Sequence, residues 1–373
     1  MPTTTVVNTV VAIVILLAVS AANAVPKPFL DERAIAFRHA ATLDDGVNIS
    51  WFERTWDAGV LKKNAIKASD FQLLKHLGFK TIRLPVAFER FKPNDRSMQK
   101  VTGYIDGILK LCSLYEFKLI ICYHSGNLND DNYIAETQYV MHIWQQLAKK
   151  YLRQSPEKLF FDIFNEPPHM NPDHWKNMAN NVIAAIRKID KSRTLIVGAS
   201  NYNSIYELSR TTPLNDPNLI YTFHFYEPFF FTHQGAEWVG DQVATIGVPF
   251  PYDGAHFPPL NPKAQGTAGE AHYNMYSRDG NEQSIKDKLQ LIKDWATRYN
   301  VPLLCGEYGV YNKYADLDSR CRYIKATRQT LKSLKIPGIL WDYNTNFSIF
   351  AGKPAIANLP DCMKDAISYK LKQ

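Results

Sequence analysis

The chain has 373 residues, of which 46% are hydrophobic, 21% charged and 13% aromatic, and it carries a formal net charge of +7. This composition excludes a disordered chain, and five cysteines are too few for a disulfide-framework protein. The basic residues are spread along the chain and form no block, so we expect no nucleic-acid partner.

The amino-terminal segment carries the one long apolar run, VVAIVILLAV at residues 10–19, and an A-x-A site follows at Ala22–Ala24. This pattern is typical of a secretory signal peptide cut after Ala24, although no Lys or Arg precedes the run. An uncleaved anchor is the alternative, but the run is short for a span of ~20 residues. We therefore expect residues 1–24 to be a signal peptide. Residues 25–373 would form one secreted or periplasmic domain, monomeric and without stable membrane association.

The cysteines show no C-x-x-C spacing. Cys122 and Cys305 lie inside apolar runs, which is typical of buried, inert thiols. An odd number of cysteines in an exported protein leaves at least one unpaired. A bridge between Cys321 and Cys362, in late helices, is possible, and the sequence leaves it open.

Short apolar runs rich in β-branched residues recur eight times along the chain. They are residues 46–49, 81–86, 118–124, 159–166, 194–198, 219–226, 301–307 and 338–342. Continuous apolar runs of this length suit parallel strands that are covered on both faces.

Helical patterns lie between these runs. Apolar residues recur with a 3.6-residue period within residues 133–154, 178–189 and 285–299. Ser69 with Gln72 resembles a capping box, Asp173 is a candidate cap for a helix from His174, and Gly78 is a candidate C′ residue.

Eight strands alternating with helices predict an α/β fold, a (β/α)8 TIM barrel. A doubly wound sheet is the rival, but no G-x-G-x-x-G string follows any strand. Residues 227–280 interrupt the alternation with no clear element and many aromatic side chains, including Phe229–Phe231 and Trp238. A segment of that length and composition indicates a functional loop.

Polar and aromatic residues stand at the carboxyl ends of six predicted strands, where barrel enzymes build their active sites. They are Arg83, His124, Asn165, Glu166, His224, Tyr226, Glu307 and Trp341. Two carboxylates from different strands are what glycoside hydrolysis requires, one protonated as the acid and one ionised as the nucleophile. Taken singly, each of these residues is more typical of a structural role, so the prediction depends on the whole set.

Four strings carry a family resemblance: IRLPV at 82–86, IFNEP at 163–167, HFYEP at 224–228 and GEYG at 306–309. From Gly46 to Asp342 the chain resembles glycoside hydrolase family 5, a retaining family with many cellulases. The resemblance implies that Glu166 is the acid/base and Glu307 the nucleophile. The other implied roles are Asn165 holding the sugar 2-hydroxyl, Arg83 and Tyr226 positioning Glu307, His124 and His224 lining the subsite before the scissile bond, and Trp341 forming its floor. Pro168 departs mildly from the family pattern, which puts the placement of His169 in doubt.

The resemblance implies an endo-β-1,4-glucanase acting on cellulose or a related β-glucan. A β-mannanase, a xyloglucanase and an exo-acting β-glucosidase stay open, as does a non-catalytic sugar-binding barrel. Trp51, Phe52, Trp238 and the Phe229–Phe231 run are candidate sugar-stacking residues.

No cofactor or metal is implied by the resemblance. Zinc held by His124, His224 and Glu307 is a minor alternative, which the positive charge of Arg83 opposes. An aldolase or isomerase barrel would need a Schiff-base lysine or a phosphate loop after the last strands, and the stretch at 343–350 is not rich in glycine.

Overall fold

A computed structural model describes residues 1–2, 31–50, 67–90, 95–124 and 126–369 of the chain. Eight parallel strands close into a barrel in chain order, which confirms the predicted (β/α)8 fold. The strands are β1 (Gly46–Asn48), β2 (Thr81–Val86), β3 (Lys118–Tyr123), β4 (Leu159–Asp162), β5 (Leu195–Val197), β6 (Leu219–Phe225), β7 (Leu303–Tyr308) and β8 (Gly338–Leu340). Each falls within or beside one of the eight predicted apolar runs.

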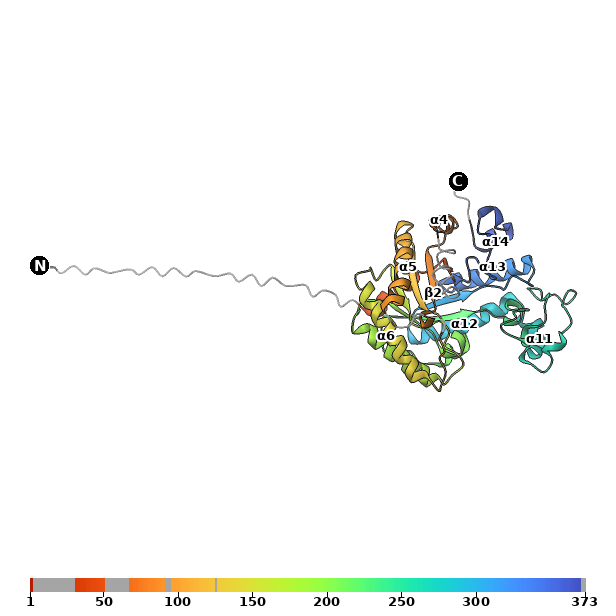
Figure 1. Ribbon diagram of the computed structural model, residues 1–373, viewed down its shortest axis with the longest axis horizontal. Helices are drawn as coiled ribbons and strands as arrows, with labels where there is room; N and C mark the ends of the chain where they lie inside the picture. Colours follow the sequence, from red (N-terminus) through yellow and green to blue (C-terminus); the bar gives the residue numbers. More distant parts are fainter. Residues whose placement is uncertain (3–30, 51–66, 91–94, 125, 370–373) are drawn as a thin grey trace. The chain divides into compact units, whose positions relative to one another are not determined.

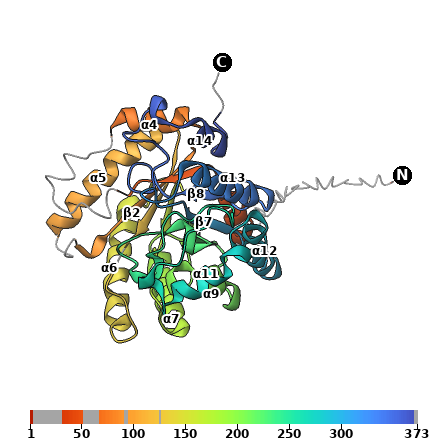
Figure 2. The same cartoon turned by 90° about the vertical axis from the view of Figure 1, so that its right-hand side faces the viewer.

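Helices surround the strands, as Figures 1 and 2 show. The longer ones are α1 (Glu32–Ala41), α4 (Ala68–His76), α5 (Asp95–Leu114), α6 (Tyr133–Tyr151), α7 (Pro172–Arg187), α12 (Glu282–Tyr299) and α13 (Leu317–Ser333), with short α8 (Ser200–Asn203), α9 (Ile205–Arg210), α14 (Asp361–Ala366), η1 (Phe88–Arg90) and η4 (Ile356–Asn358) beside them. The three predicted helical patterns correspond to α6, α7 and α12. The described residues from Glu32 onward form one compact unit, and most of the predicted signal segment lies outside the described residues.

Two predicted helix caps are wrong. The N-cap residue of helix α4 is Lys67, whose backbone N–H donates to the Asp70 carboxylate. The capping box therefore begins two residues before Ser69, the residue at which it was predicted to begin. Helix α7 is capped by the Asn171 side chain, which accepts from the N–H of Asp173. Gly78 follows the cap of α4 with φ 90°, as its predicted C′ position requires.

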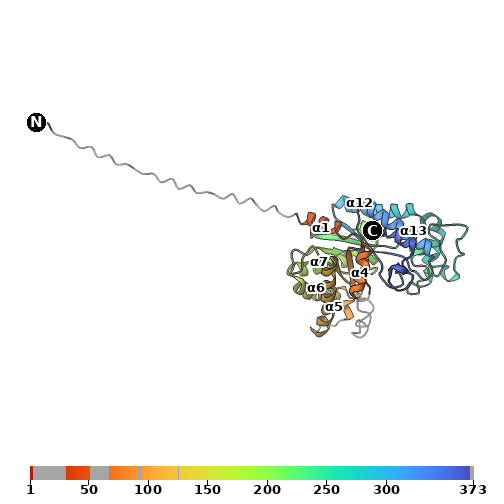
Figure 3. The ribbon, with the colours of Figure 1, turned by 90° about the horizontal axis from the view of Figure 1, so that it is seen from above.

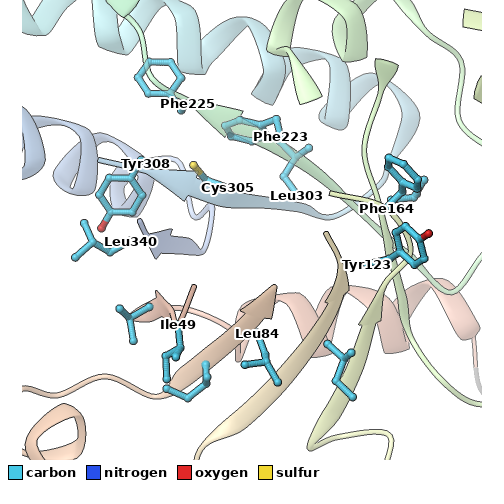
Figure 4. Close-up of a cluster of buried hydrophobic side chains, with 14 of the residues drawn as sticks. Ile49, Leu84, Tyr123, Phe164, Phe223, Phe225, Leu303, Cys305, Tyr308 and Leu340 are labelled. Atoms are coloured by element: carbon cyan, nitrogen blue, oxygen red, sulfur yellow. The ribbon is translucent and has the colours of Figure 1, made fainter. Parts of the chain in front are cut away.

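Alternation along the strands separates two apolar layers, because side chains at i and i+2 share a face. The inner layer closes the amino-terminal end of the barrel and consists of Ile120, Phe160, Ile196, Ile220, Leu304 and Ile339, with Ala40 and Leu43 from α1 and its turn. Helix α1 is fixed there because the His39 ring lies 2.6 Å from Thr194 Oγ1. Figure 3 shows α1 at the edge of the barrel. The outer layer, with Leu84, Phe223 and Cys305, packs against the helices (Figure 4).

The segment after β6 is structured, which corrects the expectation that it lacks elements. It contains α10 (Phe229–Thr232), η2 (Asp241–Val243), η3 (Pro262–Ala264) and α11 (Ala268–Asp279). Figure 1 shows α11 beyond the end of α12, at the outer edge of the barrel. Most of its aromatic rings pack on one another: Phe257 stacks on Tyr276 with centroids 5.5 Å apart.

A disulfide joins Cys321 on α13 to Cys362 on α14, the pair that the sequence leaves open. Cys112, Cys122 and Cys305 are buried thiols, as expected for the last two. Among the described residues, no helix is both long and apolar enough to cross a membrane.

Candidate active site

The barrel interior changes from apolar to polar toward the carboxyl ends of its strands. Above the apolar inner layer, the inward positions are Asn48, Arg83, Cys122, Asp162, Thr222, His224 and Trp341. A polar layer in this place is stable only if its groups satisfy one another, since burial without a partner is costly.

Arg83 on β2 is the centre of this layer and is completely buried. Its guanidinium donates to Asp162 Oδ2 at 2.9 Å, Asn48 Oδ1 at 3.0 Å, Glu307 Oε1 at 2.8 Å, Asn165 Oδ1 at 2.7 Å and Cys122 Sγ at 3.2 Å. All five N–H donors of an arginine are thus used. This single side chain therefore fixes five groups that come from four strands, β1, β3, β4 with the residues just after it, and β7.

Glu307 reaches the interior through an irregularity in β7. Strand β6 pairs regularly with β7 up to Phe223 and Cys305, but His224 then pairs with Glu307, so Gly306 is an extra residue. Since Leu304 faces inward, a regular strand would direct Glu307 outward, and the bulge at Gly306 reverses this. A Cβ at position 306 would lie 2.7 Å from Thr222 Oγ1, so the bulge needs glycine.

The Glu307 carboxylate is buried, with 4% of the residue exposed, and both of its oxygens accept hydrogen bonds. Arg83 donates to Oε1 and the Tyr226 hydroxyl donates to Oε2, each at 2.8 Å. Burial raises the pKa of Glu307, whereas electrostatic interactions with His224 and Arg83 act in the opposite direction. The two donors favour the ionised form of this carboxyl.

Glu166 lies across the cleft in a different environment. Its side chain is 34% exposed, and its Oε1 lies 2.6 Å from His224 Nδ1. One oxygen of Glu166, one of Glu307 and a His224 nitrogen lie within 4.8 Å of one another. One carboxylate is therefore buried beside a guanidinium and the other is open to solvent beside an imidazole.

Trp341 and His124 stack on one another at the same end of the barrel. Their rings are parallel to within 9°, with centroids 5.9 Å apart. The backbone N–H of Trp341 donates to Tyr308 O, which ties the end of β8 to β7. All eight residues that the sequence singled out are thus brought together at one end of the barrel.

A cation could in principle be held by Glu166, His224 and Glu307, whose donor atoms cluster, rather than by the set with His124 considered from the sequence. However, both Glu307 oxygens already accept from Arg83 and Tyr226. The buried positive charge of Arg83 also opposes a second cation. The arrangement suits chemistry by the two carboxyl groups themselves.

Comparison with known proteins agrees with this geometry. The family described as cellulase (glycosyl hydrolase family 5) matches residues 43–347. The chain belongs to this cellulase family.

Among the relatives, Endoglucanase 3 of Fibrobacter succinogenes is 30% identical over 362 residues, covering 88% of this chain and 53% of its own length. The chain thus spans about half of that relative. Endoglucanase C of Acetivibrio thermocellus is 29% identical over 302 residues, covering 76% of this chain and 86% of its own length. A solved endoglucanase from Thermotoga maritima has the same fold, with a TM-score of 0.71, 24% identity and coverage of 89% of this chain and 99% of its own.

In this family 5 glycoside hydrolase, a cavity of about 670 Å³ opens beside Glu166. Its wall includes Tyr202 from the β5 end and Phe229 and Trp238 from the segment after β6. Phe230 and Phe231 are buried in the core, so only part of the expected aromatic run faces the cavity. Trp51 and Phe52 lie outside the described residues.

Three polar partners in the site were missed from the sequence. Asn48 and Asp162 lie within predicted strands, and an isolated polar residue in a run that is otherwise buried was the available signal. Asn203, which contacts both Asn165 and His224, follows β5. No polar residue at the end of β5 was singled out, and the Asn-rich string NYN at 201–203 was the only local cue.

Proposed function

We propose that this family 5 enzyme cleaves internal β-1,4-glucosidic bonds with retention of configuration, with Glu307 as nucleophile and Glu166 as acid/base. The observation that carries the proposal is the pair of carboxyl groups in contrasting environments, with one oxygen of Glu166 within 4.8 Å of one oxygen of Glu307. Retaining enzymes hold these groups ~5–5.5 Å apart, whereas inverting enzymes need ~6.5–9.5 Å to admit a water. The separation favours retention.

The proposed reaction has two steps. A Glu307 oxygen attacks the anomeric carbon while the bond from that carbon to the glycosidic oxygen breaks, and Glu166 gives its proton to the departing oxygen. Water then attacks the same carbon, Glu166 takes a proton from it, and the ester bond to Glu307 breaks. Arg83 and Tyr226 hold Glu307 ionised for the attack, and Asn165, fixed by Arg83, is positioned for the sugar 2-hydroxyl.

The cavity beside Glu166 supports a place for the leaving-group sugars, because the acid must face the departing oxygen. Tyr202 and Trp238 are both 57% exposed and line this cavity. Trp341 and His124 are not among the residues that line this cavity, and they would then hold the sugar that becomes attached to Glu307. The cleft would thereby receive sugars on both sides of the scissile bond, which supports endo action.

Two tests address the mechanism directly. A 2-deoxy-2-fluoro-β-cellobiosyl fluoride should label the enzyme covalently, and mass spectrometry of the digest should find the sugar on Glu307. Glu307→Gln should abolish turnover while still binding cello-oligosaccharides. Labelling at another residue, or inverted product in an NMR time course, would contradict the proposal.

The substrate is proposed as cellulose or a soluble β-1,4-glucan on the names of the relatives. An exo-acting enzyme is the second candidate, since a relative that is 25% identical over 291 residues is named Cellodextrinase A. Mannan also enters the screen, because a Thermotoga maritima structure of this fold is described in complex with mannotriose. Release of reducing sugar from carboxymethylcellulose, mannan, xyloglucan and laminarin, with the products sized, separates these candidates.

Export is proposed from the signal-like segment at residues 1–24. The disulfide between Cys321 and Cys362 supports it, since such bonds persist in oxidising compartments. Amino-terminal sequencing of protein collected outside the cell should begin at Val25. A protein that stays in the cytoplasm with an intact amino terminus would contradict this proposal.

A further inference from the structure

The turn after β5 has an unusual backbone. Asn201, Tyr202 and Asn203 are consecutive left-handed residues, with φ of 58°, 61° and 55°. This conformation costs ~1–2 kcal/mol per residue for most side chains and is tolerated best by Gly and Asn. Such a run persists only where its surroundings enforce it, and it often marks a functional site.

The turn is fastened to the loop that follows Glu166. The backbone N–H of Asn201 donates to Pro168 O at 2.9 Å, and that of Tyr202 donates to Pro167 O at 2.8 Å. The two loops therefore form one hydrogen-bonded unit. In this unit the left-handed turn directs the Asn203 side chain inward, where it is completely buried.

The Asn203 amide contacts two groups next to Glu166. Its Nδ2 donates to the carbonyl oxygen of Asn165, which belongs to the peptide bond joining Asn165 to Glu166. The same Nδ2 lies 3.5 Å from Nε2 of His224. Because a carbonyl can only accept, the amide nitrogen must be on this side. The opposite side packs against Gly198, where a Cβ would lie 1.7 Å from Asn203 Oδ1.

This orientation determines the tautomer of His224. An N–H of Asn203 directed at Nε2 requires a lone pair there, so the ring proton is on Nδ1. Nδ1 lies 2.6 Å from Glu166 Oε1 and can donate to it. Burial lowers the pKa of His224 to about 4, which keeps the ring neutral.

Several charged or titratable groups surround the His224 ring in addition to Glu166. They are Glu307, Arg83, Asp162 and His124. Of these, the Glu307 carboxylate has its Oε2 3.5 Å from His224 Nδ1. Any change in the protonation of His224 therefore acts on both carboxyl groups.

We propose that Asn203 is a positioning residue that holds His224 in its Nδ1–H tautomer and thereby leaves Glu166 Oε2 as the oxygen that carries the transferred proton. The inference rests on the proposed acid/base role of Glu166. Glu166 Oε1 is occupied as an acceptor, so the acidic proton must reside on the other oxygen. The bond from Asn203 to the Asn165 carbonyl also fixes the peptide from which Glu166 extends.

Replacing Asn203 by Asp tests the proposal, because a carboxylate facing Nε2 would draw a proton to that nitrogen and favour an imidazolium. A positive ring beside Glu166 favours its ionised form, so the alkaline limb of kcat/KM should move to lower pH by about one unit. For cellotetraose, kcat/KM should fall ~10–100-fold. For 2,4-dinitrophenyl β-cellobioside, whose leaving group needs no proton, kcat/KM should stay within ~3-fold.

Asn300→Ala is the matched control, since Asn300 is also a left-handed asparagine (φ 51°) but is exposed at the end of α12. It should lower stability without changing the pH profile or the ratio between the two substrates. Equal losses on both substrates with an unchanged pH profile in Asn203→Asp would make Asn203 merely structural and overturn the inference.

The wild-type protein allows a direct measurement that needs no folded variant. With 15N-labelled histidine, the ring nitrogen shifts of His224, assigned with His224→Gln, should show protonated Nδ1 and unprotonated Nε2. The opposite pattern overturns the inference. Glu166→Gln distinguishes the underlying function: if it does not reproduce the contrast between the two substrates, the acid/base assignment itself fails, whatever Asn203 does.

Discussion

Arg83 Nη1 lies 2.8 Å from Glu307 Oε1, and both side chains are buried. Asp162 Oδ2 lies 2.9 Å from the same guanidinium, so one buried cation lies between two buried carboxylates. Burial raises the pKa of Asp162 as well as that of Glu307. The positive charge of Arg83 is what makes ionisation of Glu307 compatible with its position inside the barrel.

Arg83→Met should therefore affect both stability and the pH profile. Loss of one partner of a buried ion pair costs ~3–5 kcal/mol of unfolding free energy. Arg83 opposes the rise in the Glu307 pKa that burial causes, so its removal should raise that pKa further. Glu307, the proposed nucleophile, would then be ionised only at higher pH, and the acid limb of kcat/KM should move upward, with kcat/KM falling by ~100-fold or more.

Arg193→Met is the control for this prediction. Arg193 is likewise completely buried and lies 3.0 Å from Asp190 Oδ2, on the chain before β5 and away from the site. Arg193→Met should lower the unfolding free energy, measured with urea, by a comparable amount, while the acid limb of its kcat/KM profile stays in place. An acid limb that does not move in Arg83→Met would show that Arg83 does not control the ionisation of Glu307.

The bulge in β7 makes a second prediction. Gly306→Ala would place a Cβ 2.7 Å from Thr222 Oγ1 and 3.2 Å from His224 Nε2. Overpacking of this kind costs ~1–3 kcal/mol, and the shift of Glu307 should lower kcat by ~10-fold or more. Thr222→Ala in the same chain should recover part of the stability by removing the nearer contact.

Gly103→Ala on α5 is the control, because a Cβ there would meet nothing within 4 Å. Alanine is the better helix former, so this variant should be at least as stable as the parent. Thermal unfolding and kcat on carboxymethylcellulose check both variants. Full activity in Gly306→Ala would mean that the bulge tolerates a side chain and does not fix Glu307.

The barrel itself could be predicted because parallel strands covered on both faces leave continuous apolar runs in the sequence. The polar residues at strand ends could be found in the same way, since Asn165 and Glu166 come three and four residues after the end of β4, and Tyr226 directly follows β6. Each of these signals lies within one short stretch of sequence, so it can be recognised without knowing which strands are neighbours.

The remaining features depend on contacts that are distant in sequence. The inward turn of Glu307 comes from an extra residue, Gly306, whose effect is visible only against its partner strand β6. The position of Asn203 depends on carbonyls of Pro167 and Pro168. The aromatic residues after β6 could be counted from the sequence, but they could not be sorted into core residues and exposed residues. Phe230 is buried in the core, whereas Trp238 is exposed.

Trp238→Ala provides a third prediction, on the side of the cleft that is proposed to receive the leaving group. The Trp238 ring is held by Tyr311, with centroids 4.8 Å apart, and lines the cavity beside Glu166. A lost stacking contact of ~1.4 kcal/mol is ~10-fold in affinity, so kcat/KM for cellohexaose should fall by about that factor. Activity on 2,4-dinitrophenyl β-cellobioside should be unchanged, because its leaving group does not extend that far.

Tyr252→Ala is the matched control, since Tyr252 is another exposed aromatic residue of the same segment and does not line the cavity. It should behave as the parent on both substrates. If Trp238→Ala lowered kcat/KM equally for the aryl cellobioside and for cellohexaose, Trp238 would act on the whole cleft. The assignment of this cavity to the leaving group would then be wrong.

Asp45 makes a prediction about acid stability. Burial alone would raise its pKa, but hydrogen bonds from Lys80 and Lys332 and the charge of Arg328 lower it to about 2. A carboxyl with a depressed folded-state pKa stabilises the fold above its unfolded value of ~3.9, and this contribution is lost as pH falls toward 2.

Asp45→Asn should therefore lower the unfolding free energy by ~1–2 kcal/mol at about pH 6, and the difference from the parent should shrink as the pH falls from ~4 to ~2. Urea unfolding at several pH values measures it. Asp131→Asn, an exposed carboxyl before α6, is the control and should follow the parent throughout. If Asp45→Asn lowered the unfolding free energy by the same amount at every pH, the loss would come from the packing of Asp45. Its charge interactions with the three basic residues would then not stabilise the fold.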